Sequence, residues 1–294
     1  MEQENSYKKN WYKKNWYKKN RKLIRLLCVI VFILAVVGLG IYSIWYLWQS
    51  LEARNTQKEL QTLRVEDIEQ EYDIPHDEDE ERTAPISSPD IMSQYQSLYE
   101  TNSDMIGWLS IDDTVIDYPV MQTMEDEDYY LKLDFYGQPN QNGCLMMDTD
   151  SVVGTGTKAC AYADGSAPST NLIIHGHTMK TGEMFGDLKL YADETYGKEH
   201  SMIRFDSLYE EREYELIAVF YSQVFYESDK VFKFYKFFQA DTQEEFDDWY
   251  QNIKAMSLYD TGVTAELGDE FITLSCCAYH VEDGRFVVVG KRVK

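Results

Sequence analysis

An uncharged apolar segment near the N-terminus constrains this chain more than any other feature of its sequence. Between Leu26 and Trp48 there is no Asp, Glu, Lys or Arg. As a helix this segment would be about 35 Å long, enough to cross a hydrocarbon layer of about 30 Å with modest tilt. It is longer than the apolar core of a typical signal peptide, and no small-residue cleavage site of the A-x-A type follows it. We therefore predict a single transmembrane helix over residues 26–48.

The charges around this segment predict its orientation. Residues 1–25 carry nine Lys and Arg against Glu2 and Glu4, a local charge of +7, so the rest of a chain with a formal charge of −23 carries −30. Because positive flanks stay in the cytoplasm, we expect a basic cytoplasmic tail at residues 1–25 and a C-terminal domain outside the cell. The negative charge of that domain argues against nucleic acid as a partner.

Two polar segments flank the apolar one. The tail repeats the sequence Trp-Tyr-Lys-Lys-Asn at residues 11–15 and 16–20. A basic, aromatic tail suits anionic lipid headgroups, although a disordered tail needed only for orientation fits the pattern equally well. Residues 49–90 have the composition of an acidic extracytoplasmic stalk, in which residues 50–64 can form a polar helix and charge repulsion extends the remainder.

Residues 91–294 have the pattern of one β-rich globular domain. Short apolar runs broken by turn residues indicate strands, whereas residues 91–99, 183–191 and 242–256 have helical patterns. The expected strands are residues 108–111, 115–120, 144–147, 172–175, 202–205, 214–224, 271–277 and 285–293. Many strands with few helices favour a β-barrel with mixed connections over a Rossmann-type α/β fold.

Five cysteines raise the question of disulfides. Cys28 falls in the apolar segment, and the vicinal pair Cys276 and Cys277 has Cα atoms fixed about 3.8 Å apart, shorter than the usual disulfide span. A bridge between Cys144 and Cys160 stays open. So few cysteines in a domain of this size do not indicate a disulfide scaffold.

The last cysteine has the pattern of a reactive thiol. In a strand over residues 271–277, alternation places Leu274 and Cys276 on one face, and Ser275 and Cys277 on the other, more polar face. Most free cysteines are small buried apolar residues, which is the role we expect for Cys276. Cys277 is instead a candidate nucleophile.

A second strand begins shortly after Cys277. Gly284 lies in the short connection, and two strands joined in this way pair as neighbours, so Arg285 is expected beside the thiol. A guanidinium there would favour the thiolate and donate to a developing oxyanion. A solvent-exposed arginine at a strand edge is the alternative.

Residues 171–179 supply a candidate proton-transfer group. The segment has the pattern of a strand that runs into a glycine-containing loop, with His175 and His177 near its end. An imidazole, with an ordinary pKa of about 6.5, exchanges protons with a thiol near neutral pH. The same histidines with one cysteine offer ligands to Zn²⁺. Adjacent cysteines on a strand face opposite ways, however, and no third or fourth ligand is obvious in the sequence, so we expect no metal.

Together these segments resemble the sortase family. Residues 273–277, Thr-Leu-Ser-Cys-Cys, resemble the family's T-L-S-T-C strand with Cys276 in place of Thr, and residues 285–288 resemble its arginine strand. Gly176 and His177 match its histidine motif, whose N-x-I-I-x-G-H-x-M form here is closest to class B. Further class B matches are residues 106–111, 116–120, 184–188 and 246–256, and the resemblance covers residues 91–294.

Two features depart from the class B pattern. His175 stands where class B members commonly have Tyr, so two histidines compete for the catalytic role, and alignment of the motif favours His177. Residues 151–170, rich in Gly, Ala, Ser and Thr, look like an inserted loop before the histidine strand.

The resemblance implies a mostly β fold, an eight-stranded sortase-type β-barrel with a few short helices, as the catalytic domain at residues 91–294. It implies an enzyme on the outer face of a Gram-positive cell membrane that acts on secreted proteins with a C-terminal sorting signal. Its cysteine attacks a threonine carbonyl of that signal, forms a thioester, and transfers the protein to a cell-wall peptide or pilin amine. This chemistry needs no cofactor.

The resemblance also implies a role for each site residue. Cys277 is the nucleophile, Arg285 stabilises the oxyanion, and His177 protonates the leaving amine. Ser275 and Tyr279 are expected to line the substrate groove. The alternative functions are a cysteine endopeptidase that hydrolyses the same thioester and a non-catalytic, membrane-anchored binding module.

Overall fold

The structure is a computed structural model that describes residues 2–72, 90–155 and 167–294. The chain forms two compact units, Met1–Glu52 and Ala53–Lys294, and helix α1 (Glu2–Tyr72) contributes residues to both. The four-part division expected from the sequence, with boundaries after residues 25, 48 and 90, stays a prediction.

In the first unit, α1 carries the apolar segment. Phe32 and Leu39, for example, expose 70% and 67% of their surface. The helix over Asn20–Arg64 is long and apolar enough to cross a membrane. Because such a surface is costly in water and suited to lipid, it is consistent with the predicted anchor, whereas the orientation stays a prediction.

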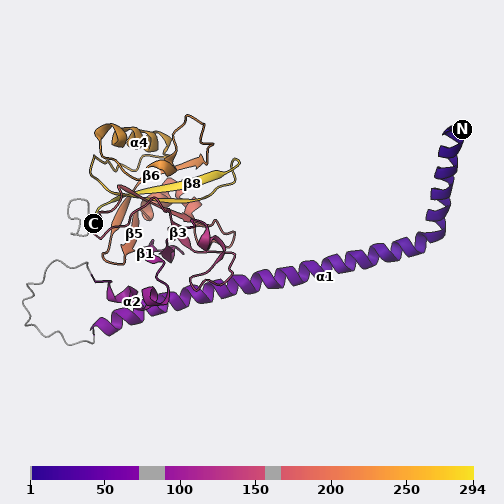
Figure 1. Cartoon of the computed structure of the whole chain (residues 1–294), viewed down its shortest axis with the longest axis horizontal. Helices are drawn as coiled ribbons and strands as arrows, with labels where there is room; N and C mark the ends of the chain where they lie inside the picture. The colour runs from indigo at the N-terminus through magenta and orange to yellow at the C-terminus, as the bar shows by residue number, and fades with distance from the viewer. Residues whose placement is uncertain (1, 73–89, 156–166) are drawn as a thin grey trace, which may run out of the picture. The chain divides into compact units, whose positions relative to one another are not determined.

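Eight strands in the second unit close into a barrel (Figure 1). The strands are β1 (Met105–Ser110), β2 (Asp117–Met121), β3 (Leu145–Met147), β4 (Asn171–Gly176), β5 (Met202–Ser207), β6 (Glu213–Gln223), β7 (Phe271–Cys277) and β8 (Gly284–Arg292). Their order around the barrel is β1-β2-β3-β4-β7-β8-β6-β5, with parallel pairs at β2–β3 and β4–β7. The barrel with mixed connections predicted from the sequence is confirmed.

Side chains alternate between the interior of the barrel and its outside. Ile174 on β4 and Leu274 and Cys276 on β7 belong to the interior apolar cluster. Phe271, on the other face of β7, packs in a separate cluster outside the barrel. The two faces predicted for this strand are therefore confirmed, and Cys276 is the buried apolar residue expected.

Helix α4 (Gln243–Met256) covers one outer face of the barrel (Figure 1). It begins with a capping box, in which Thr242 and Glu245 satisfy each other's backbone N–H groups. Trp249 is 2% exposed, and its ring centroid lies 4.6 Å from that of Phe271 on β7. The predicted helix is confirmed, and it shields the part of the outer face that lies away from Cys277.

The helical segment at residues 53–64 packs on another outer face, together with α2 (Ser93–Thr101). Leu60 is 2% exposed and belongs to a cluster with Tyr95 of α2 and Trp108 of β1. This segment has an apolar contact face within its polar sequence, so it belongs to the folded unit and does not stand free as part of a stalk. The acidic run over residues 73–89 lies outside the described residues.

Polar contacts fix the same helical segment. The Arg64 guanidinium lies 5.2 Å from the centre of the Trp108 ring, and its Nη1 lies 3.4 Å from Oδ1 of Asp117. Gln61 Nε2 donates to Oδ2 of Asp117 at 2.7 Å. A cation over a tryptophan ring contributes about 0.5–2 kcal/mol, depending on its desolvation. The docked helix is therefore held by both apolar and charged contacts.

The α-helix expected over residues 183–191 is wrong. A loop forms there, followed by the 3₁₀ helix η3 (Leu188–Ala192). Met184 has a φ of 55° and Gly182 a φ of 90°, both in the left-handed region that an α-helix excludes. Phe185 and Leu188, which suggested a helical period, are instead buried in the barrel interior. The remaining short helices are η1 (Tyr129–Lys132), α3 (Glu194–Glu199) and η4 (Phe234–Lys236).

Cys144 is a free, buried thiol whose Sγ lies 3.4 Å from the carbonyl oxygen of Leu133. Burial raises the pKa of this thiol well above its ordinary range. Of the bridge to Cys160 that the sequence left open, only Cys144 lies among the described residues. Cys160 and residues 156–166 of the predicted insertion lie outside the described residues.

Replacing Leu60 tests whether its helix is part of the folded domain. We expect Leu60→Ala to lower the free energy of unfolding by about 2–5 kcal/mol, because it leaves a cavity under the docked helix. Denaturant unfolding of the full chain in detergent, followed by near-UV circular dichroism, measures this loss. Asn55→Ala changes an exposed position of the same helix and serves as the control. Equal midpoints for the two variants would mean that the helix is not docked.

Candidate active site

Three adjacent strands place the candidate residues at one end of the barrel. β4 and β7 run parallel with Gly176 opposite Cys276, so His177 follows the last paired residue of β4. β7 and β8 run antiparallel with Cys277 opposite Arg285. Because neighbouring strands lie about 4.8 Å apart, the three side chains start from adjoining backbone positions.

A cavity of about 250 Å³ opens at this end. His177, Cys277 and Arg285 all line it, so the structure brings together the three residues proposed from the sequence. The other lining residues are Glu127, Asp128, Leu131, Met146, Met147, Asp148, His175, Gly176, Ser275 and Cys276. The cavity therefore combines two thiols, two imidazoles, a guanidinium and several carboxylates.

The two cysteines differ in their surroundings. Cys277 is a free, half-buried thiol, and its backbone carbonyl accepts a hydrogen bond from Thr178 Oγ1 at 2.6 Å. Cys276 is 2% exposed, and burial raises its pKa to about 11, although the nearby Thr178 hydroxyl opposes part of that shift. A thiol that stays protonated near neutral pH is a poor nucleophile, so Cys277 rather than Cys276 remains the candidate nucleophile.

His177 is held by a backbone carbonyl. Its Nε2 lies 2.7 Å from the carbonyl oxygen of Leu131, which is part of η1. A carbonyl oxygen only accepts hydrogen bonds, so Nε2 carries the proton in this arrangement. Nδ1 is then the ring nitrogen with a lone pair that can accept a hydrogen bond or a proton.

His175 lines the same cavity but has a different partner. Its Nε2 lies 3.3 Å from Oδ2 of Asp148, and the carboxylate side chain is 13% exposed. This contact ties His175 to the segment that follows β3. The structure thus separates the two histidines by their partners, an acidic side chain for His175 and a backbone carbonyl for His177.

Arg285 stands beside the thiol in the sheet and is half-buried. Its Nη1 donates to the carbonyl oxygens of Gly284 at 3.1 Å and Asp283 at 3.3 Å. Those bonds keep the guanidinium near the beginning of β8, where it lines the cavity. A guanidinium at this position can donate hydrogen bonds into the cavity.

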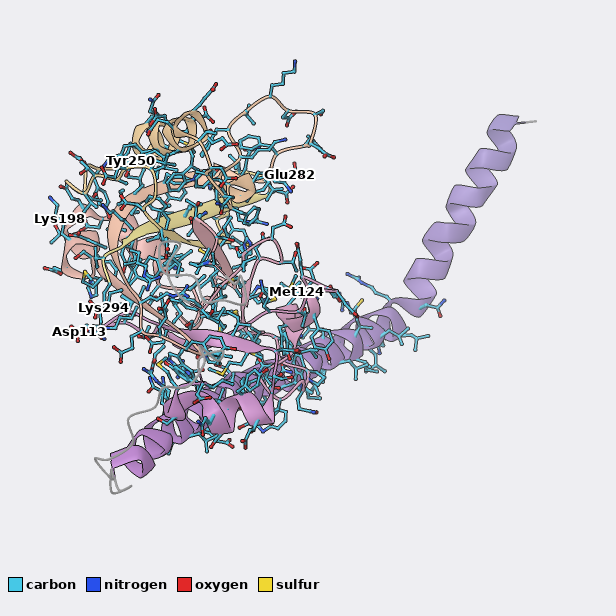
Figure 2. The ribbon with its side chains drawn as sticks, turned by 60° about the vertical axis from the view of Figure 1, so that its left-hand side comes forward. Asp113, Met124, Lys198, Tyr250, Glu282 and Lys294 are labelled. Atoms are coloured by element: carbon cyan, nitrogen blue, oxygen red, sulfur yellow. The ribbon has the colours of Figure 1, made fainter. Side chains whose placement is uncertain are left out.

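The two residues proposed for the substrate groove lie in different surroundings. Ser275 is 1% exposed, lines the cavity, and has an Oγ without a hydrogen-bond partner among the described residues. Tyr279 is 86% exposed in the connection between β7 and β8, which Glu282 marks in Figure 2. A substrate role for either residue stays a prediction.

Metal ligands can be examined within the described residues. There, no group of three or more His, Cys, Asp and Glu side chains is arranged to hold a metal ion. The zinc alternative considered for His175 and His177 therefore has no ligand cluster in that part of the chain.

Sequence reasoning missed two residues that shape the site. Thr178 donates to the carbonyl of Cys277, and the carbonyl of Leu131 holds His177. The position of Thr178, directly after the histidine, was a usable signal. A backbone carbonyl exists at every residue, so no sequence signal could have singled out Leu131.

Selective alkylation tests the contrast between the two cysteines. At pH 7 we expect iodoacetamide to modify Cys277 in the folded protein and to leave Cys276 unmodified, because a thiol with a pKa of about 11 stays protonated until far higher pH. In denaturant both should react. Tandem mass spectrometry of the peptide that contains both cysteines locates the label. Equal alkylation rates for Cys276 and Cys277 in the folded protein would contradict the choice of Cys277 as the reactive cysteine.

Comparison with known proteins places this arrangement in a family. The chain matches no protein-family model. It is 32% identical over 206 residues to Sortase B of Listeria monocytogenes, which covers 69% of this chain and 76% of that protein. Sortase B of Bacillus anthracis in complex with AAEK1 matches with a TM-score of 0.61 and 28% identity, over 84% of this chain and 98% of that one. The Staphylococcus aureus sortase B–substrate complex, at 22% identity and a TM-score of 0.65 over the same shares, supports the fold. An identity of 32% sustained over two thirds of the chain, on the same barrel, places this protein in the class B sortases, a family of cysteine transpeptidases, and sets aside the non-catalytic alternative.

Proposed function

We propose that this sortase cleaves a C-terminal sorting signal at a threonine carbonyl and transfers the secreted protein to a cell-wall peptide or pilin amine, with Cys277, His177 and Arg285 as its catalytic residues. The observation that carries the proposal is the single cavity that all three side chains line, at the end of three adjacent strands. A nucleophile, a proton-transfer group and an oxyanion donor at one site are the parts that acyl transfer requires.

The first half of the reaction forms a thioester. The Cys277 thiolate forms a C–S bond to the threonine carbonyl carbon, and the carbonyl oxygen becomes an oxyanion beside Arg285. The C–N bond then breaks as His177, in its imidazolium form, gives its proton to the departing amine. An acyl-enzyme and a neutral imidazole result.

The second half releases the product. The acceptor enters as an ammonium and gives one proton to neutral His177 and one to water during its attack on the thioester. The new C–N bond forms and the C–S bond breaks, so the cysteine leaves as a thiolate. The thiolate and imidazolium pair is thereby restored. Water in place of the amine would give hydrolysis, which is the endopeptidase alternative.

Several observations support the substrate and location parts of the proposal. Sortase B of S. aureus, one of the structural matches, forms a complex with a substrate. In this chain Ser275 Oγ is a buried hydroxyl free to bind such a substrate at the cavity wall, and Tyr279 is a proposed outer contact. The apolar part of α1 and the basic tail before it support attachment to the membrane with the catalytic domain outside the cell.

Removal of the sulfur tests the nucleophile. We expect Cys277→Ala to abolish cleavage of a threonine-containing sorting peptide and to form no thioester, because no other group in the proposed mechanism attacks the carbonyl. Cys276→Thr, which introduces the residue common in the family, is the matched control and should still form the adduct. Mass spectrometry of the trapped acyl-enzyme measures both, and turnover unchanged in Cys277→Ala would refute the proposal.

The two histidines can be separated by the same assay. We expect His177→Ala to lower kcat by about 10²–10⁴-fold, the usual contribution of a positioned proton-transfer group. His175→Ala removes an imidazole from the same cavity and should cost far less, because its Nε2 is directed to Asp148. Equal or reversed losses would show that the histidine assignment is wrong.

A further inference from the structure

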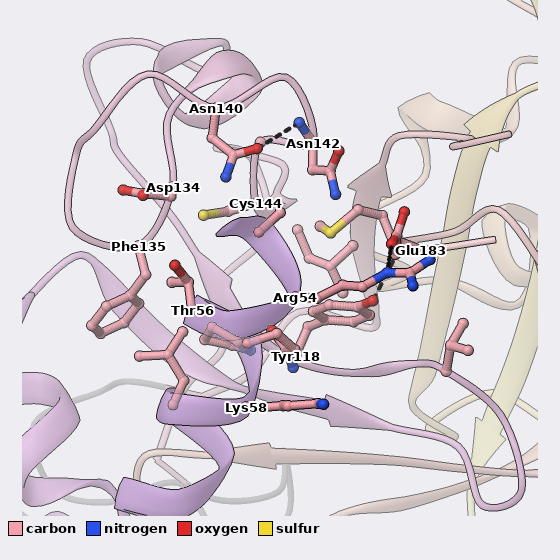
Figure 3. Close-up of a pocket in the computed structure, with 18 of the residues that line it drawn as sticks. Arg54, Thr56, Lys58, Tyr118, Asp134, Phe135, Asn140, Asn142, Cys144 and Glu183 are labelled. Carbon is pink, nitrogen blue, oxygen red and sulfur yellow. Dashed lines mark hydrogen bonds and ion pairs between the residues drawn. The ribbon is translucent and has the colours of Figure 1, made fainter. Parts of the chain in front are cut away.

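A second cavity, of about 480 Å³, lies between the docked segment of α1 and the barrel (Figure 3). On the helix side Arg54, Gln57 and Leu60 line it, and on the barrel side Tyr118 and Glu183 do so. Among the described residues, none that lines it also lines the active-site cavity. It nevertheless borders the loop that follows His177, because Thr181, Glu183 and Met184 line it.

One ion pair crosses this cavity. Arg54 Nε donates to Oε1 of Glu183, as the dashed line in Figure 3 shows, and Thr181 Oγ1 donates to the other carboxylate oxygen. The Glu183 side chain is 11% exposed, whereas that of Arg54 is 52% exposed. A carboxylate this buried is costly without a cationic partner, so Arg54, together with the Thr181 hydroxyl, stabilises Glu183 in this position. The same contact raises the pKa of Arg54 above its ordinary value, so the guanidinium keeps its charge.

Glu183 belongs to the loop that starts at the catalytic histidine. Phe185 N–H donates to the carbonyl oxygen of His177 at 3.0 Å, and Thr178 pairs with Met184 in an isolated β-bridge. The loop is thus closed on itself, with Glu183 one residue before the bridge. These two contacts, made by the residues next to Glu183, connect its position to the backbone of His177.

The same loop also contacts the nucleophile. Thr178 Oγ1 donates to the carbonyl oxygen of Cys277 at 2.6 Å. On the other side of the loop, Met184 N–H donates to the Tyr118 hydroxyl at 3.1 Å. The loop therefore connects β2, β4 and β7, and Arg54 joins it to α1.

The docked helix supports the other partner of the histidine as well. Leu60 shares an apolar cluster with Tyr130, which lies in η1 directly before Leu131. The Leu131 carbonyl accepts the hydrogen bond from His177. The loop that follows His177 and the Leu131 carbonyl that its ring binds are thus both held by elements that contact α1.

We propose that Arg54 is a positioning residue for the sortase reaction, whose ion pair with Glu183 holds the loop after His177 and so sets the imidazole relative to Cys277. Arg54 itself touches no reacting atom. This inference rests on the proposed function in that it takes His177 and Cys277 as the catalytic pair. It gives the docked helical segment at residues 53–64 a part in catalysis, in addition to linking the apolar segment to the barrel.

Full-length protein in detergent tests the proposal through the rate constants. We expect Arg54→Ala to lower kcat for a threonine-containing sorting peptide by about 10–100-fold with little change in KM, since small displacements of a catalytic group cost up to about 100-fold. Arg54→Lys should keep most of the activity, and Arg54→Glu combined with Glu183→Arg should recover more activity than either single change. Lys58→Ala, which removes another cation at the edge of the same cavity, is the control and should leave kcat unchanged.

The alkylation rate of Cys277 provides a readout that needs no peptide substrate. In Arg54→Ala we expect the pH profile of iodoacetamide labelling at Cys277 to move to higher pH, because a displaced imidazolium stabilises the thiolate less. The other ionisable groups that line its cavity remain in the variant: Glu127, Asp128, Asp148, His175, Cys276 and Arg285. Thermal unfolding distinguishes repositioning from loss of the fold.

The outcomes separate this proposal from the proposed function. An unchanged labelling profile and unchanged kcat in Arg54→Ala, or no recovery in the charge-exchanged double variant, would overturn the positioning role. Failure of the wild-type protein to cleave any threonine-containing peptide would instead count against the proposed substrate, and the labelling profile would still decide the role of Arg54. A shifted profile with retained thermal stability, together with activity in Arg54→Lys, would support it.

Discussion

The parallel pairing of β4 with β7 is the constraint on which the rest of this structure depends. It joins the strand that ends before His177 to the strand that ends at Cys277, although about 100 residues separate them in the chain, and β8 then adds Arg285 on the other side. Because side chains alternate along a strand, a slip of one residue would turn Cys277 inward and expose Cys276. The chemistry proposed for Cys277 therefore requires this register.

Apolar packing on both faces of the central strands supports that register. Ile174 and Leu274 fill the interior, and Phe271 at the other end of β7 packs beneath Trp249 of α4. A one-residue slip would move all of these side chains to the wrong face, at a cost of about 1.5–3 kcal/mol for each large apolar side chain exposed. The outer face of β7 is covered where α4 packs on Phe271, whereas Cys277 at the other end of the strand lines the cavity.

How far the sequence predicts this structure depends on where the determining contacts lie. All eight strands, the two faces of β7 and the adjacency of Cys277 to Arg285 follow from alternation and short connections, which are local. The docking of residues 53–64 was not predicted. Their composition is mostly polar, and the residues that their few apolar side chains contact, such as Trp108, are distant in sequence. The loop in place of a helix at residues 183–191 has a similar cause, since Phe185 and Leu188 are buried by the barrel rather than by a helical neighbour. The partner of His177 is a backbone carbonyl, which carries no sequence signal.

These different sources of order make the three proposed catalytic residues unequal. Cys277 and Arg285 are paired members of a continuous β-ladder, so the backbone hydrogen bonds of the sheet fix their positions. His177 lies one residue beyond β4, and its position depends on side-chain and carbonyl contacts made by a loop and by η1. Loops open more readily than the strands that carry them. The position of the His177 imidazole therefore depends more on neighbouring elements than the positions of Cys277 and Arg285 do. In this chain those elements include the part of α1 that follows the apolar segment.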